Sequence, residues 1–183
     1  MARKKHFQSM TLDIKPFVPS DVCLSCGGCC RFCEQHTPWT PLFLFEEIRA
    51  LLQKELLPCC LFSHAANKTG EAARIDLLPS GEGWICPCLD EKTSRCGIYE
   101  DRPLECRLYP FLLVSHEGRR VLAVDPHCPY IQERLEDKEF AAYLENLRQT
   151  LSSAAAKKVF KENGCLFQKY PQGYRILRDF PEF

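Results

Sequence analysis

The stretch Cys23-Leu-Ser-Cys26-Gly-Gly-Cys29-Cys30-Arg-Phe-Cys33 places five thiols within eleven residues. Spacers this short let a chain wrap around one ion or inorganic cluster, with ligand sulfurs about 2.3 Å from a bound zinc. Gly27 and Gly28 supply the backbone freedom that tight wrapping needs. We therefore interpret this stretch as a metal-binding segment that organises the fold, rather than as a run of small buried side chains.

The composition of the chain limits the classes of protein to which it can belong. The chain has 183 residues, and its 24 basic side chains balance its 24 acidic ones, which argues against a strongly electrostatic binder of nucleic acid or membranes. No apolar run approaches the ~20 residues of a membrane span. The basic N-terminal residues lead into no apolar stretch, so we expect no secretory signal and a cytoplasmic location. Thiols stay reduced there, and the odd number of 13 cysteines could not all pair in disulfides.

Four further cysteines are widely spaced. Cys86, Cys96, Cys106 and Cys128 follow or precede turn signals such as Ser80-Gly81-Glu82-Gly83 and Thr93-Ser94. We expect them on loops and hairpin ends rather than inside helices, where they could approach the N-terminal cysteines.

The residues around these four cysteines carry a family resemblance. The string Cys96-Gly-Ile-Tyr-Glu-Asp-Arg-Pro-Leu-Glu-Cys106-Arg-Leu-Tyr-Pro-Phe, downstream of Cys86-Pro-Cys-Leu-Asp and of Cys23-x2-Cys26-x2-Cys29-Cys30, resembles the CxxCxxCC family of bacterial and archaeal cysteine-cluster proteins. The resemblance covers residues 20–130 and implies a zinc- or iron-chelating domain. A flagellin lysine methylase, regarded as an iron–sulfur protein, looks like a distant relative.

The resemblance also implies which thiols bind the metal. The family's eight cysteines map to Cys23, Cys26, Cys29, Cys30, Cys86, Cys96, Cys106 and Cys128. Five cysteines fall outside the pattern: Cys33, Cys59, Cys60, Cys88 and Cys165. Cys88 stands where the family usually has an aromatic residue. We interpret Cys59 and Cys60 as half-buried spacers after a helix end.

The sequence leaves the metal open between zinc and an iron–sulfur cluster, because thiolate ligands select both. Zinc modules usually contain two closely spaced cysteine pairs, such as two Cys-x2-Cys motifs. Here only the N-terminal cysteines are closely spaced, and the other ligands are single cysteines. Cys23-x2-Cys26-x2-Cys29-x3-Cys33 matches a ferredoxin-like [4Fe–4S] run, although Glu34 replaces the usual proline. Cys26-x3-Cys30-x-Phe32-Cys33 resembles the loop of radical S-adenosylmethionine enzymes, but the repeating strand–helix units of their barrel are missing from the predicted elements.

Three functions fit these observations. The first is a metal-binding protein, the second a metal-dependent protein-modifying enzyme by analogy to the methylase, and the third a zinc-built module that binds an unidentified protein. The sequence contains no phosphate-binding loop or hydrolase motif, so no catalytic residue is assigned.

Three arginines and one histidine near the cysteines each have two interpretations, one as part of the metal site and one as part of the surrounding structure. Arg95, Arg102 and Arg107 could offset thiolate charge, while Arg102 could instead bind a nearby carboxylate or carbonyl in its own turn. His127 is either a turn residue or a ligand or hydrogen-bond donor beside Cys128.

The predicted fold is α+β: a small irregular domain centred on metal, with short hairpins and a helix, followed by a long C-terminal helix. Residues 1–20 form a lead-in with a possible edge strand at 17–18, residues 21–130 the cysteine-cluster domain and residues 131–183 a helical extension. The patterns predict a helix over 41–57, hairpins over 73–89 and 109–125, and a helix over 137–162 that Asn163-Gly164 ends. Two short strand-like runs then flank a turn at 171–173.

Overall fold

The computed structural model describes residues 12–62, 72–171 and 173–180. It contains helices and small antiparallel sheets, so the α+β class is confirmed in that form. The helices are α1 (Ser20–Cys26), α2 (Phe45–Gln53), α3 (Leu104–Leu108), α4 (Pro129–Gln132), α5 (Lys138–Leu151) and α6 (Ala154–Glu162). The strands are β1 (Arg31–Phe32), β2 (Leu42–Leu44), β3 (Ala72–Arg74), β4 (Leu78–Ser80), β5 (Gly83–Ile85), β6 (Leu89–Asp90), β7 (Arg95–Cys96), β8 (Phe111–His116), β9 (Arg119–Val124) and β10 (Arg175–Asp179).

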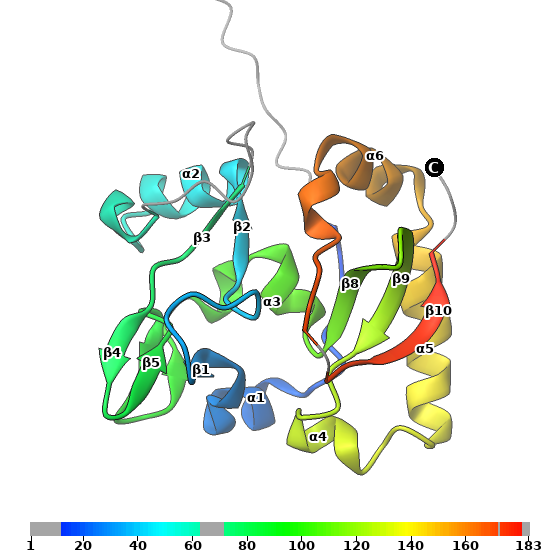
Figure 1. Ribbon diagram of the computed structural model, residues 1–183, viewed down its shortest axis with the longest axis horizontal. Coiled ribbons are helices and arrows are strands. Elements are labelled where there is room, and N and C mark those ends of the chain that lie inside the picture. The colour runs from blue at the N-terminus through cyan, green and yellow to red at the C-terminus, as the bar shows by residue number, and fades with distance from the viewer. Residues whose placement is uncertain (1–11, 63–71, 172, 181–183) are drawn as a thin grey trace, which may run out of the picture.

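The largest sheet has the order β10-β9-β8, and α5 and α6 accompany it on one side of the molecule (Figure 1). The predicted hairpin over 109–125 is confirmed as β8 and β9, which turn at Glu117 and Gly118. Both turn residues have positive φ, +50° and +79°, the backbone of a tight turn whose twist matches that of the strands it joins. Alternate residues then face opposite sides: Phe111 packs toward α5, while Leu112 belongs to a second apolar cluster with Tyr170.

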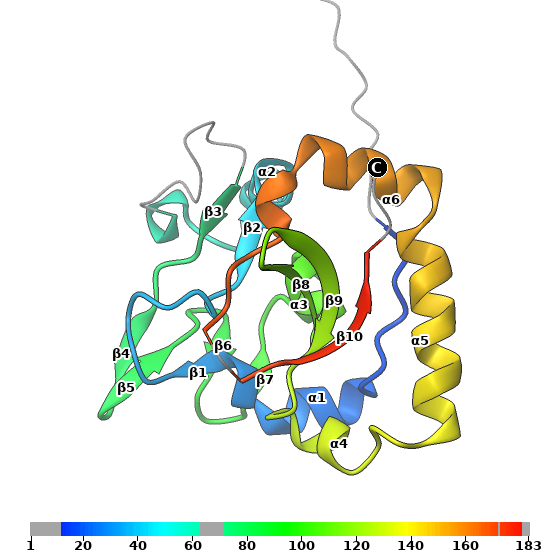
Figure 2. The same ribbon diagram turned by 45° about the vertical axis from the view of Figure 1, so that its right-hand side comes forward.

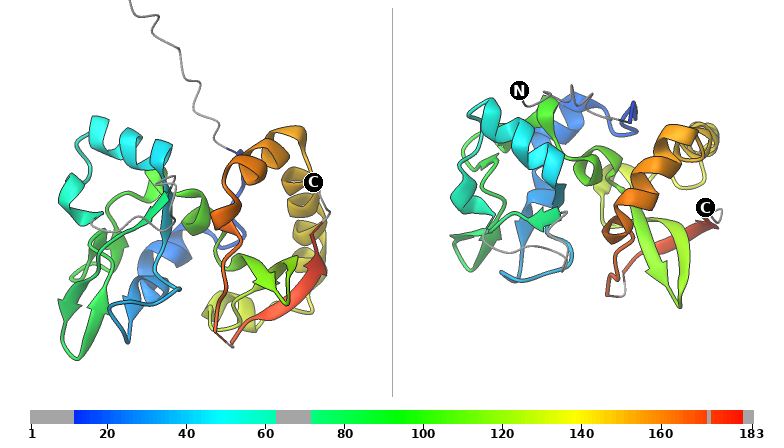
Figure 3. Two further views of the ribbon diagram at one scale, coloured as in Figure 1. Left: turned by 45° about the horizontal axis from the view of Figure 1, so that its top comes forward. Right: turned by 90° about the horizontal axis from the view of Figure 1, so that it is seen from above.

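Smaller sheets and α2 make up the other side of the molecule (Figure 3). Their pairings are β1-β5-β4, β2-β3 and β6-β7. Strand β2 serves two cores, because Leu42 and Leu44 join the core of the β8–β9 side and Phe43 joins that of the α2 side. Helices α1 and α3 lie between the two sides (Figures 1 and 2). The predicted ligands are divided between these two cores: Cys23 and Cys128 pack in the first, and Cys30, Cys86 and Cys96 in the second.

The predicted helix over 41–57 is shorter than expected. Residues 42–44 pair with Ala72–Arg74 as a strand, and the helix spans only Phe45–Gln53. The Glu47 carboxylate accepts a hydrogen bond from the Leu44 amide at 2.9 Å, which caps the helix at this later point. Glu55, with φ at +55°, breaks the helical backbone before Pro58 is reached.

The predicted long C-terminal helix is wrong, because two helices occupy its place. The chain breaks at Ser152 and Ser153 between α5 and α6, which run in different directions (Figure 2). The Ser153 hydroxyl accepts a hydrogen bond from the Ala156 amide at 3.2 Å, so it caps a new helix. The predicted end at Asn163-Gly164 is confirmed.

Of the remaining element predictions, the strand at 17–18 is wrong and the hairpin over 73–89 is correct only in part. Residues 17–18 form no strand; Phe17 instead packs edge-on against Phe111, Tyr130 and Phe140. In the hairpin predicted over 73–89 only the turn and its nearest residues are correct, since β4 and β5 are short and Ala72–Arg74 pairs elsewhere.

The C-terminal segment supplies a strand. The second strand-like run after the helices is β10, which pairs antiparallel with β9. Gln172, in the predicted turn before it, lies outside the described residues. Every helix in the described part of the chain is too short or too polar to cross a membrane.

Candidate metal centre

The N-terminal cysteines lie on a helix and the turn that follows it. Cys23 and Cys26 are three residues apart on α1, so they share one face of that helix. The helix ends at Gly27, whose φ of +62° reverses the chain and whose missing Cβ leaves room for Leu89. A single 3₁₀ turn, Gly28–Cys30, then carries Cys29 and Cys30. The paired glycines thus bring four thiols to one region.

The four separated cysteines come from four different elements. Cys86 follows β5, Cys96 ends β7 and Cys128 occupies the N-cap position of α4. Cys106 lies inside α3, which contradicts the expectation that it sits on a loop. Pairing of β1 with β5 brings the strands together, and the Cys86 amide donates to the Cys30 carbonyl at 2.9 Å.

Each of the eight predicted ligands lies within electrostatic range of at least one of the others, and we call this set the thiol cluster. Thiol–thiol hydrogen bonds link Cys29 to Cys30 and Cys30 to Cys86. Electrostatic interactions connect the other five to this chain: Cys23 and Cys96 interact with Cys29, Cys106 with Cys29, Cys30 and Cys86, and Cys26 and Cys128 with each other and with Cys29. Cys29 therefore lies within electrostatic range of Cys23, Cys26, Cys96, Cys106 and Cys128.

The structure raises the pKa values of the thiols of Cys23, Cys29, Cys30, Cys86, Cys96, Cys106 and Cys128. Burial is the main cause that raises the pKa of the Cys23, Cys96, Cys106 and Cys128 thiols, and neighbouring cysteines add to it. The pKa of Cys29 is raised first by its hydrogen bond with Cys30 and then by burial. A bound cation reverses this effect, because it stabilises the thiolate that burial destabilises.

Arg102 is the cation that contacts this cluster. Its Nη1 lies 3.6 Å from Cys23 Sγ, and it lowers the pKa values of Cys23, Cys29 and Cys96 against the raising effect of burial. The alternative role in its own turn is also present, because Nε donates to the Tyr99 carbonyl at 2.9 Å. Arg95 is exposed, and Arg107 binds the Leu12 carbonyl instead.

The surplus cysteines differ in position. Cys88, which sequence reasoning set aside, is buried and hydrogen-bonded to Cys86, so it borders the cluster; only its proximity to Cys86 in the chain could have indicated this. Cys165 packs against the core. Cys33, Cys59 and Cys60 are exposed. The expectation of half-buried Cys59 and Cys60 is wrong, because the turn directs Leu61 and Phe62 into the core in their place.

His127 is held beside the cluster by a carboxylate. Its Nδ1 lies 2.9 Å from Asp125 Oδ1, and the other oxygen of Asp125 accepts from the Tyr109 hydroxyl at 3.0 Å. The imidazole side chain is 72% exposed. Tyr109 interacts with Cys29 and Cys128, so its side chain adjoins the cluster, whereas the structure places His127 on the surface.

A second buried polar group lies next to Cys106. The Glu105 carboxylate accepts hydrogen bonds from the Leu42 amide, the Gln168 amide group and the Tyr170 hydroxyl, the last at 2.6 Å. Burial raises its pKa to about 7. This carboxylate ties α3 to β2 and to the C-terminal segment, and so fixes the helix that carries Cys106.

The donor atoms do not yet surround an ion. Among the described residues, no group of three or more His, Cys, Asp or Glu side chains has the arrangement needed to hold a metal ion. Binding therefore requires the thiols to lose protons and their side chains to turn.

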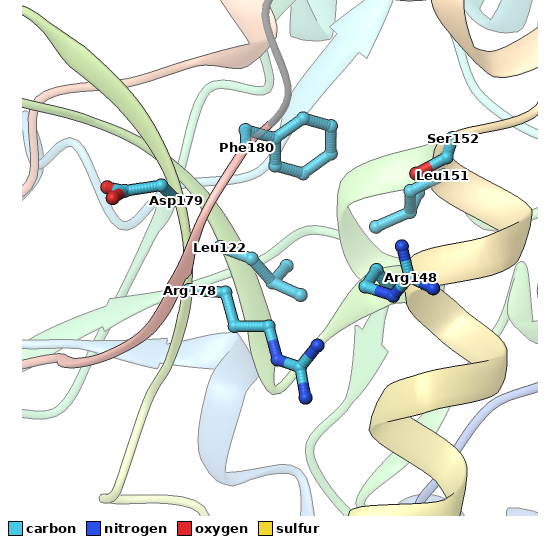
Figure 4. A pocket seen from close by; sticks show the side chains of 7 residues that line it. All are labelled: Leu122, Arg148, Leu151, Ser152, Arg178, Asp179 and Phe180. Atoms are coloured by element: carbon cyan, nitrogen blue, oxygen red, sulfur yellow. The ribbon is translucent and has the colours of Figure 1, made fainter.

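Two pockets lie away from the thiols. The first, of about 20 Å³, lies between α5 and the end of β10, with Arg148 and Arg178 at its side and Leu122 and Phe180 within it (Figure 4). The second, of about 320 Å³, is lined by residues of 35–40 and by Arg74–Leu77. No cysteine lines either one.

Comparison with known proteins agrees with this picture. An uncharacterized protein of Methanocaldococcus jannaschii is 44% identical over 43 residues, which is 24% of each chain, so the chain spans about a quarter of the relative it matches. No solved structure matches the chain. The pattern of the CxxCxxCC family, described as "Putative zinc- or iron-chelating domain", matches residues 22–129, which is more than half of the chain. This protein therefore belongs to the CxxCxxCC family.

Proposed function

We propose that this protein is a cytoplasmic metal-binding protein whose thiol cluster holds an iron–sulfur cluster or zinc. The observation that supports the proposal is the match of residues 22–129 to the family of zinc- or iron-chelating domains, and the electrostatic influence of several thiols on Cys29 agrees with it. Reduced thiols are needed for this role, and none of the thirteen cysteines forms a disulfide in the structure.

The donor set suits soft metals. Thiolates bind zinc and iron–sulfur clusters in preference to magnesium, calcium or manganese. Cys86 and Cys128 are buried, whereas Cys26 and Cys29 are exposed, so the set is reachable from the surface. Carboxylates approach the cluster less closely: Glu105 is engaged by three donors and Asp125 by His127 and Tyr109.

Loading exchanges protons for metal. Each thiol that served as a ligand would release its proton, and Cys29, Cys30 and Cys86 would give up their hydrogen bonds to one another. One zinc ion or one [4Fe–4S] cluster takes four thiolates. The eight cysteines of the cluster therefore accommodate either two such centres or one centre with spare ligands.

Anaerobic purification with metal and acid-labile sulfide analysis tests the proposal. A brown protein with sulfide identifies an iron–sulfur cluster, and a colourless protein with stoichiometric zinc identifies zinc. The number of metal atoms per chain separates one centre from two. A reduced and folded chain that takes up neither metal would refute the proposal. Cys165→Ala is the control for a cysteine outside the cluster and should take up as much metal as the native chain.

A further inference from the structure

We propose that Arg102 is a positioning residue of the metal centre: it holds the Cys23 sulfur in place and compensates the negative charge of the loaded thiolates. This inference rests on the proposed function and adds a residue outside the eight cysteines. Arg102 reaches Cys23 from 79 positions away in the sequence, with Nη1 3.6 Å from Sγ.

Two contacts within its own turn fix the guanidinium before it meets the sulfur. Nε donates to the Tyr99 carbonyl at 2.9 Å, and the guanidinium carbon lies 3.6 Å from the centroid of the Tyr99 ring. Stacking on an aromatic ring and a hydrogen bond at one edge leave the far edge of the planar group free to point at Cys23. The side chain is only partly exposed, so its charge is screened less than that of a surface arginine.

The need for a cation follows from charge balance. Four thiolates around Zn²⁺ carry a net charge of about −2, and four around a [4Fe–4S] cluster also leave a negative centre. Arg102 interacts with Cys23, Cys29 and Cys96, so its positive charge acts on several thiols at once. Groups that donate hydrogen bonds to a ligand atom orient that ligand and change the affinity of the site for its metal.

The structure supplies a matched control. Arg95 adjoins Cys96 in the sequence, on β7, but its side chain is exposed. Arg95→Gln removes the same charge from the same region without removing a contact to sulfur. Arg102→Lys keeps the positive charge while it loses the planar fork and the bond to the Tyr99 carbonyl.

Two measurements test the inference. The first is the zinc affinity of the reduced full-length protein, from competition with a chromophoric chelator. The second is thermal unfolding of the metal-free form. Arg102→Gln should weaken zinc binding on the order of 10–100-fold, as loss of such supporting groups typically does. Arg102→Lys should recover part of this loss, and Arg95→Gln should bind zinc as the native chain does.

The outcomes separate this inference from the proposed function. Native zinc affinity in Arg102→Gln, or an equal loss in Arg95→Gln, would overturn the positioning role while leaving the metal site intact. A fall in metal-free stability with unchanged zinc affinity would assign Arg102 to the turn alone and also overturn it. If Arg102→Gln does not fold, the comparison of Arg102→Lys with Arg95→Gln decides. Failure of the native chain to bind zinc or iron would instead sink the proposed function.

Discussion

Raising the pH from about 5 to about 8 should destabilise the metal-free protein, because Glu105 is buried with a raised pKa. Burial raises that pKa from an ordinary 4.5 to about 7, against the lowering effects of the Tyr170 and Leu42 hydrogen bonds and of Arg74. The folded state therefore keeps a proton that the unfolded state has released. The stabilising contribution is complete below about pH 4.5 and is lost as the pH rises through about 7.

The size of the effect follows from the pKa difference. A difference of about 2.5, at about 1.4 kcal/mol for each pKa unit, corresponds to about 3 kcal/mol of unfolding free energy. Glu47, whose pKa burial also raises, acts with the same sign. Asp90 and Glu145 have lowered pKa values, so they change the free energy of unfolding only below about pH 4.5. The raised thiol pKa values change it only above about pH 9. Comparison with Glu105→Gln then separates the contribution of Glu105 from that of every other group in this window.

Urea unfolding of the chelated, reduced protein at several pH values measures this contribution. Glu105→Gln cannot ionise, so most of the pH dependence should disappear, although the variant starts from lower stability because an amide nitrogen must face one of the three donors. Glu133→Gln, at a carboxylate that is 79% exposed, is the control and should keep the native slope. Native stability that stays level or rises across the window, or a full slope in Glu105→Gln, would refute the reasoning.

Three further predictions concern the metal centre and the helix break. Zinc affinity should fall at least tenfold for each pH unit below neutrality, because at least one thiol proton leaves per bound ion; a pH-independent constant from chelator competition would contradict this. Cys86→Ala should lower the zinc bound per chain or weaken it, whereas Cys165→Ala should not, and equal metal content in both would argue against Cys86 as a ligand. Ser153→Ala should cost about 1 kcal/mol in urea unfolding through loss of the α6 cap, and a loss no larger than that of Ser152→Ala would show that the cap is unimportant.

Local sequence determined the features that depend on near neighbours. Five thiols separated by short spacers and two glycines must wrap closely wherever they lie, and Glu117-Gly118 can turn a hairpin by itself because both residues adopt positive φ. The eight predicted ligands follow from the family pattern, and a residue's own turn explains why Arg102 bonds to the Tyr99 carbonyl. These features involve separations of a few residues, over which backbone preferences dominate.

Tertiary structure decided what depends on distant partners. Residues 42–44 suit a helix by pattern, yet they become a strand because Ala72–Arg74 offers them backbone hydrogen bonds. The break at Ser153 arises because a serine hydroxyl can cap a helix, and only packing of α6 on the core selects that option over a continuous helix. The meeting of Arg102 with Cys23, 79 positions apart, depends on a chain crossing that no local preference encodes.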